Sequence, residues 1–96
     1  MTKIIVKSFE EELGSELFVV TSETKTKEEI LKCCRIAEKY AGMCWDDIEE
    51  QKPDEHWKTM VEWREGCNGI ETFNAYLEEF CECKVEPLEY DFAYEW

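Results

Sequence analysis

The chain has 96 residues, of which 24 are acidic and 11 are basic, so its formal net charge is −13 at pH 7. This length indicates one domain with a single modest core that needs neither metal nor disulfides. The charge makes nucleic acid and anionic membrane surfaces poor partners and makes basic protein surfaces good ones.

Two runs near the N-terminus, Lys3–Phe9 and Leu17–Ser22, are rich in β-branched and aromatic residues. Such residues fit the pleated, half-buried surface of a sheet. The residues between the two runs are polar and include Gly14. Together they predict an antiparallel hairpin whose loop is longer than a tight turn.

Two helices carry capping boxes, the pattern in which a cap residue and a glutamate three positions later satisfy each other's backbone N–H groups. The first box is Thr26 with Glu29, and the helix it opens ends at Gly42. The second is Asn68 with Glu71, and its helix extends to Phe80. Their apolar residues recur at helical spacing and are predicted to face the core. They are Ile30, Cys33, Cys34, Ala37, Tyr40 and Ala41 in the first helix, and Ile70, Phe73, Tyr76, Leu77 and Phe80 in the second.

Between these helices the pattern predicts a short helix over Met43–Gln51, with Trp45 and Ile48 inward and its acidic residues outward. Lys52 and Pro53 end this segment. Asp54 is then predicted to cap a further helix that reaches about Glu65 and carries its own apolar stripe.

The C-terminal stretch Leu88–Trp96 alternates apolar and charged residues, which is typical of a strand with one dry face and one wet face. We expect its aromatic residues to close the core and Cys81–Lys84 to form the preceding turn. Pro87 is compatible only with a sheet edge or a bulge. The prediction is one α+β domain over residues 1–96, in which the hairpin and this strand form a small antiparallel sheet with about three helices on one face.

The residue pattern contains no catalytic motif, cofactor motif or metal-binding motif. Cys81 and Cys83 with Cys44 and Cys67 could supply four thiolates, but their spacing lacks the paired knuckles of structural zinc sites. Buried cysteines that act as small apolar residues are the simpler interpretation. His56 is the only histidine and is expected in a packed or surface position. We therefore predict that the protein is not an enzyme and has no metal or cofactor.

Location follows from the same composition. No run approaches the length of a membrane span, and Ile4–Val6 is far too short for the apolar region of a signal peptide. The expected location is the cytoplasm, where the six cysteines stay reduced.

The acidic residues are concentrated in one half of the chain. Residues 1–42 contain seven basic and eight acidic residues, whereas residues 43–96 contain four and sixteen. A solvated face that keeps the protein soluble would explain many acids, but folding does not require this asymmetry, because self-repulsion opposes compactness. Outward acids recur at about 5–6 Å on a helix and about 6.6 Å along a strand, similar to successive phosphates of a nucleic acid. The predicted partner-binding residues are Asp46, Asp47, Glu49, Glu50, Asp54, Glu55, Glu62, Glu78, Glu79, Glu82, Glu89, Asp91 and Glu95.

In size, charge and α+β character the chain resembles the small acidic proteins of phages and mobile elements that block CRISPR effectors or restriction enzymes, some by mimicking DNA. No motif aligns with that class, so the resemblance assigns no residue. It implies an inhibitor that occupies the basic nucleic-acid-binding surface of such a target. The alternative is a general protein-interaction module or a small homo-oligomer that uses an aromatic surface.

Overall fold

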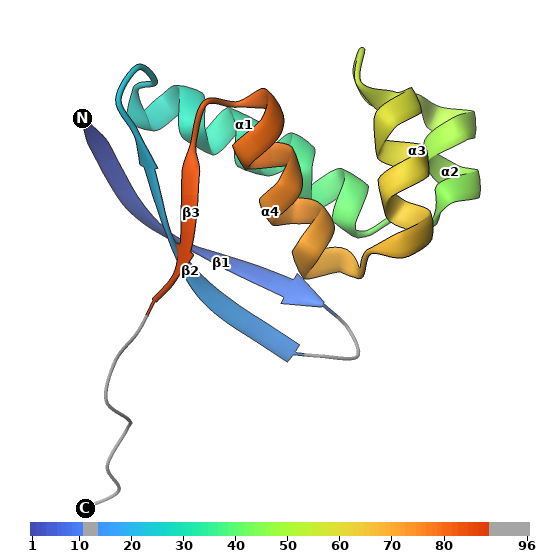
Figure 1. The fold of residues 1–96 in the computed structure, drawn as a ribbon, viewed down its shortest axis with the longest axis horizontal. Coiled ribbons are helices and arrows are strands. Elements are labelled where there is room, and N and C mark those ends of the chain that lie inside the picture. The colour runs from blue at the N-terminus through green and yellow to red at the C-terminus, as the bar shows by residue number, and fades with distance from the viewer. Residues whose placement is uncertain (11–13, 89–96) are drawn as a thin grey trace, which may run out of the picture.

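The computed structural model describes residues 1–10 and 14–88 and confirms the α+β prediction (Figure 1). This part of the chain forms three strands and four helices. In order they are β1 (Thr2–Glu10), β2 (Gly14–Ser22), α1 (Lys27–Ala41), α2 (Trp45–Gln51), α3 (Trp57–Gly66), α4 (Gly69–Phe80) and β3 (Lys84–Pro87).

The sheet is antiparallel with the strand order β1-β2-β3. The predicted hairpin is confirmed, with Ile5 opposite Val19 in its middle. Pairing continues to Glu10 opposite Gly14, so the connection is shorter than predicted. Polar residues at the end of a hairpin extend the ladder through their backbones, and a pattern of apolar residues does not indicate such pairing.

The third strand lies earlier in the chain than predicted. β3 pairs with β2 over residues that were assigned partly to a turn, and Val85 lies opposite Val20. Pro87 is in the edge strand, as its missing N–H requires. The prediction of an aromatic strand that closes the core falls mainly on residues 89–96, which lie outside the described residues.

Helices α1 and α4 cover one face of the sheet, and the core lies between these layers (Figure 1). Both capping boxes are present, with backbone N–H groups donating to Thr26 Oγ1 at 3.2 Å and to Asn68 Oδ1 at 2.8 Å. The buried core residues come from β2, all four helices and the loop before β3. They include Val20, Ile30, Ala37, Tyr40, Ile48, Met60, Phe73, Tyr76, Leu77, Cys81 and Cys83.

The α2–α3 pair lies at the end of the molecule away from β3 (Figure 1). Stacked rings join α3 to α4, with centroid distances of 3.8 Å from His56 to Phe80 and 5.5 Å from Trp63 to Phe80. Arg64 donates hydrogen bonds to the carbonyl oxygens of Met43 at 2.8 Å and Cys67 at 2.7 Å, which fixes α3 against the start of α2. The α2–α3 pair is therefore held to the core by the buried side chains of Ile48 and Met60, by aromatic packing and by Arg64.

Candidate functional site

Helix α2 is the most acidic element of the described chain. Its sequence is WDDIEEQ, and Ile48 is its one buried residue. Asp46, Asp47, Glu49 and Glu50 are all exposed, as predicted. Because this helix of two turns buries a single residue, its four carboxylates all lie at the protein surface.

Further exposed carboxylates belong to α3, α4 and the residues before α3. Glu55 and Glu79 are the sequence neighbours of His56 and Phe80, whose rings stack, and both are exposed. Glu62 and Glu78 are also exposed on these helices. The predicted positions on α2, α3 and α4 are thus solvent-facing, and their helices pack as neighbours.

Most of these carboxylates lack a compensating cation. In the described part of the chain, the ion pairs join Lys25 to Glu82, Lys84 to Glu86, and His56 to Glu55 when the histidine is protonated. The exposed predicted partner-binding residues without an ion pair there are Asp46, Asp47, Glu49, Glu50, Glu62, Glu78 and Glu79. Exposed α1 cations such as Lys32 and Lys39 are not paired with them either. The α2–α3–α4 surface, defined by these seven carboxylates and Glu55, therefore carries a strong negative potential.

Trp45 is a surface residue that the helical pattern places incorrectly. It was predicted to face inward with Ile48, yet 44% of it is exposed. Trp45 is the first residue of α2, and so short a helix buries only the part that contacts its neighbours. The brevity of the segment, bounded by Cys44 and Lys52, is the sequence signal that could have identified this exposed tryptophan.

Asp54 has a structural role, and it is not the cap residue of α3 that the sequence predicted. Its carboxylate accepts hydrogen bonds from the hydroxyl of Tyr40, from the hydroxyl of Tyr76 at 2.5 Å, and from the backbone N–H of His56 at 2.9 Å. Helix α3 begins only at Trp57, with His56 in the cap position. Two tyrosines from the core face thus converge on one half-buried carboxylate, and Asp54 links α1 and α4 to the start of α3.

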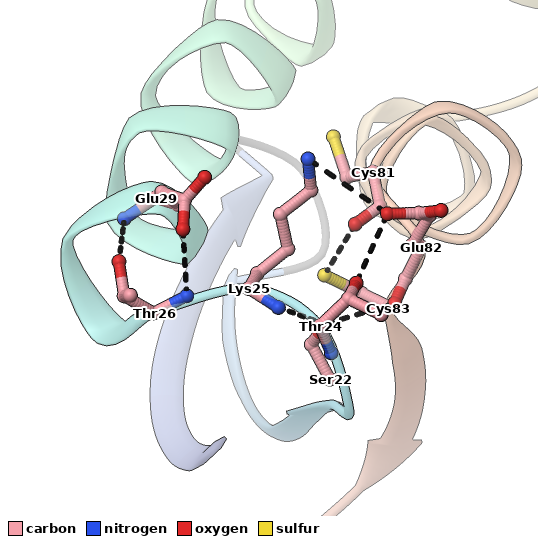
Figure 2. A network of polar contacts seen from close by, with 8 residues as sticks. All are labelled: Ser22, Thr24, Lys25, Thr26, Glu29, Cys81, Glu82 and Cys83. Atoms are coloured by element: carbon pink, nitrogen blue, oxygen red, sulfur yellow. Dashed lines mark hydrogen bonds and ion pairs between the residues drawn. The ribbon is translucent and has the colours of Figure 1, made fainter. Parts of the chain in front are cut away.

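Glu82 also makes contacts within the fold, through its carboxylate and its carbonyl oxygen (Figure 2). Its carboxylate accepts a hydrogen bond from Thr24 at 3.0 Å and lies 3.9 Å from the Lys25 ammonium. Its carbonyl oxygen accepts the Ser22 hydroxyl at 3.1 Å. Its backbone has a φ of 53°, which is unusual for a residue with a side chain. Glu82 therefore joins the α4–β3 turn to the β2–α1 loop, while its side chain stays 67% exposed.

The remaining predicted partner-binding residues, Glu89, Asp91 and Glu95, lie outside the described residues. The candidate surface consists of the α2, α3 and α4 carboxylates together with Trp45.

The cysteines do not form the considered metal site. Cys81 and Cys83 are buried, whereas Cys44 is exposed at the start of α2 and donates to Asp47. The Cys81 thiol lies beside Cys33, and burial raises the pKa of both Cys81 and Cys34, the latter to about 12. Across residues 1–10 and 14–88, no group of three or more His, Cys, Asp or Glu side chains is arranged to hold a metal.

Comparison of the chain with protein-family models, with curated protein sequences and with solved structures finds no match. None of the helices in the described ranges has the length and apolar character that spanning a membrane requires.

The tyrosine pair on Asp54 predicts loss of stability at alkaline pH. Burial, and then the hydrogen bond to Asp54, raise the pKa of both Tyr40 and Tyr76 above the usual value of about 10. The folded state therefore holds these protons more tightly than the unfolded state, so the stability is present below pH 10 and is lost as the pH rises above it. The melting temperature should fall more steeply above about pH 10 than that of the Tyr40→Phe/Tyr76→Phe variant. Parallel curves for the two proteins would contradict this account.

Proposed function

We propose that the protein binds a basic, nucleic-acid-handling protein and blocks its nucleic-acid-binding surface. The contact surface is the α2–α3–α4 surface, with Trp45 as an apolar anchor. The observation that carries the proposal is the arrangement on α2, where four exposed carboxylates without ion pairs accompany one exposed tryptophan.

The like-charge pairs within this arrangement oppose folding of the isolated protein. Asp46 lies three and four positions before Glu49 and Glu50, and each like-charge pair at such spacing costs roughly 0.2–0.5 kcal/mol. A basic partner would convert this repulsion into attraction. Surface charges that oppose folding and favour association are expected where binding is the selected property.

Trp45 adds an apolar contact that can contribute binding affinity, which the carboxylates alone do not provide. Charges on the rim of an interface mainly steer association and select partners, whereas buried tryptophan and arginine side chains contribute most of the affinity. The indole face also attracts arginine guanidinium groups, which are abundant on surfaces that bind phosphates. A tryptophan beside carboxylates therefore suits an arginine-rich surface.

Nucleic-acid-binding surfaces match the geometry as well as the charge. They present basic side chains in rows that follow a phosphate backbone. Outward carboxylates on one helix recur at about 5–6 Å and supply a comparable row on a rigid support. The resemblance to phage and mobile-element inhibitors points to a CRISPR effector or a restriction enzyme as the kind of target.

The proposal is tested by affinity capture from a lysate of cells that express a nucleic-acid-handling target of this kind. At low salt, the immobilised protein should retain a basic nucleic-acid-binding protein, identified by mass spectrometry. Retention should fall steeply with added salt, because exposed charges are screened beyond about 10 Å at 0.1 M ionic strength. Salt-resistant capture of proteins without a basic surface would instead support the general interaction module.

A further inference from the structure

Strand β1 has an edge that no described residue covers with a strand. It is nine residues long and, within the described chain, pairs only with β2. Its outward-facing Ile5 is 60% exposed. A strand edge presents unpaired backbone N–H and C=O groups that can accept a further strand.

A groove runs along this edge, between β1 and α1. It has a volume of about 270 Å³ and is lined by Ile5, Val6 and Lys7 of β1, by Phe73 of α4, and by α1 residues that include Leu31 and Arg35. Successive strand residues point to opposite faces, so three consecutive residues line one groove only where it follows the strand edge. A volume below the ~300–1,000 Å³ of small-molecule pockets suits one side chain of a peptide. We call this edge and its groove the β1 groove.

The charges on β1 select the strand that the groove accepts. Lys3 and Lys7 are exposed on the same face of β1 as Ile5, whereas Arg35 and Glu38 line the groove from α1 and offset each other. If two copies paired through β1 about Ile5, Lys3 of each copy would lie opposite Lys7 of the other, and like charges in that position are destabilising. The edge therefore disfavours a second β1 strand and favours an acidic one.

We propose that the β1 groove binds the segment Glu89–Trp96 of a second copy of this chain, and that the exchange of two such segments forms a symmetric dimer. Tyr90, Phe92, Tyr94 and Trp96 share one parity of this segment, and Glu89, Asp91 and Glu95 share the other. In a strand added to β1, one parity enters the groove between Leu31 and Phe73, and the other faces Lys3 and Lys7. Aromatic side chains and carboxylates thereby each meet a matching surface.

The position of Leu88 favours exchange between copies. Its backbone N–H donates to Leu17 on β2 at 2.9 Å, which places the start of the segment on the far side of β2 from the β1 edge. Lying antiparallel to β1 on the free edge of its own sheet would require the segment to move three strand spacings, roughly 14 Å, and to reverse direction. A reciprocal exchange needs no reversal and makes the two contacts identical, as in a two-fold dimer.

A charge exchange between the two surfaces tests the proposal in the full chain, by sedimentation velocity over a concentration series. The wild type should form a reversible dimer at micromolar concentrations. Lys3→Glu/Lys7→Glu alone and Glu89→Lys/Asp91→Lys alone should each weaken the dimer about tenfold or more, since each turns attractive cross-strand pairs into repulsive ones. The two pairs of substitutions in one chain should restore the wild-type dissociation constant to within about threefold.

Lys27→Glu/Lys39→Glu is the matched control, because it changes the net charge equally on α1 residues that do not line the groove. It should leave the dissociation constant within about threefold of that of the wild type. A wild-type chain that stays monomeric across the series would overturn the proposal. Failure of the combined variant to recover the dimer would overturn it as well. The test is independent of any basic partner protein.

Discussion

The free energy of unfolding should fall by about 3 kcal/mol when Asp54 is replaced by alanine. The substitution removes the acceptor of two tyrosine hydroxyls and of the His56 backbone N–H. Tyr40 and Tyr76 are almost fully buried, at 0% and 4% exposure, so their hydroxyls cannot turn to bulk water without a rearrangement. Each buried donor left without a partner costs about 1–3 kcal/mol. Urea unfolding followed by tryptophan fluorescence measures the loss.

Asp47→Ala is the matched control for this experiment. It removes a carboxylate from an exposed position where the contact is the Cys44 thiol, so the expected change is within about 0.5 kcal/mol. A double-mutant cycle identifies the cause. Tyr40→Phe should be destabilising in the wild type but nearly neutral in Asp54→Ala, because the unpaired hydroxyl is then removed. Equal costs of Asp54→Ala and Asp47→Ala would show that the tyrosine–carboxylate cluster does not stabilise the fold.

Partner binding should weaken by about 100-fold or more when Asp46, Asp47, Glu49 and Glu50 are all replaced by lysine, because like charges then face each other across the interface. The fold should persist, since all four side chains are exposed. The substitutions remove the favourable interaction of Asp46 and Asp47 with the helix dipole. Relief of like-charge repulsion offsets part of this loss. Isothermal titration with the captured partner measures the affinity, and circular dichroism measures the fold.

The control replaces four other exposed acids, Glu23, Glu28, Glu38 and Glu86, with lysine and so changes the net charge equally. Affinity should then fall far less than with the α2 variant. A Trp45→Ala variant distinguishes the proposed inhibitor of a basic protein from a general interaction module that uses an aromatic surface. An aromatic interface would lose binding on Trp45→Ala while tolerating both salt and the α2 lysines. An equal effect of the two lysine variants would mean that net charge alone controls binding and that α2 has no special role.

Local signals predicted most of the helices. The capping boxes at Thr26 and Asn68 identify both the start of each helix and the glutamate that pairs with the cap residue, so α1 and α4 begin where expected. The third strand could not be placed in the same way. β3 is short, and Val85 is its one partly buried residue packed against the core, so its identity depends on pairing with β2 and not on a pattern of its own.

The candidate surface was predictable as a set of exposed charges but not as a site. Asp54 and Glu55 are adjacent acids in a polar stretch, and nothing local distinguishes the one that accepts two tyrosine hydroxyls from the one that faces solvent. Glu82 is similar, since its role depends on Thr24 and Lys25, more than fifty residues away in sequence. Contacts between distant segments decide which acids are used inside the fold.

Competition with nucleic acid is the most direct test of the proposed function. A fluorescent DNA or RNA substrate of the captured partner would be held at a fixed concentration, and its anisotropy would be followed as the protein is added. If the protein occupies the nucleic-acid-binding surface, the substrate should be displaced completely, and more substrate should raise the protein concentration needed in proportion. The variant with four α2 lysines should displace none in the same range. A ternary complex of partner, substrate and protein at saturation would contradict the account.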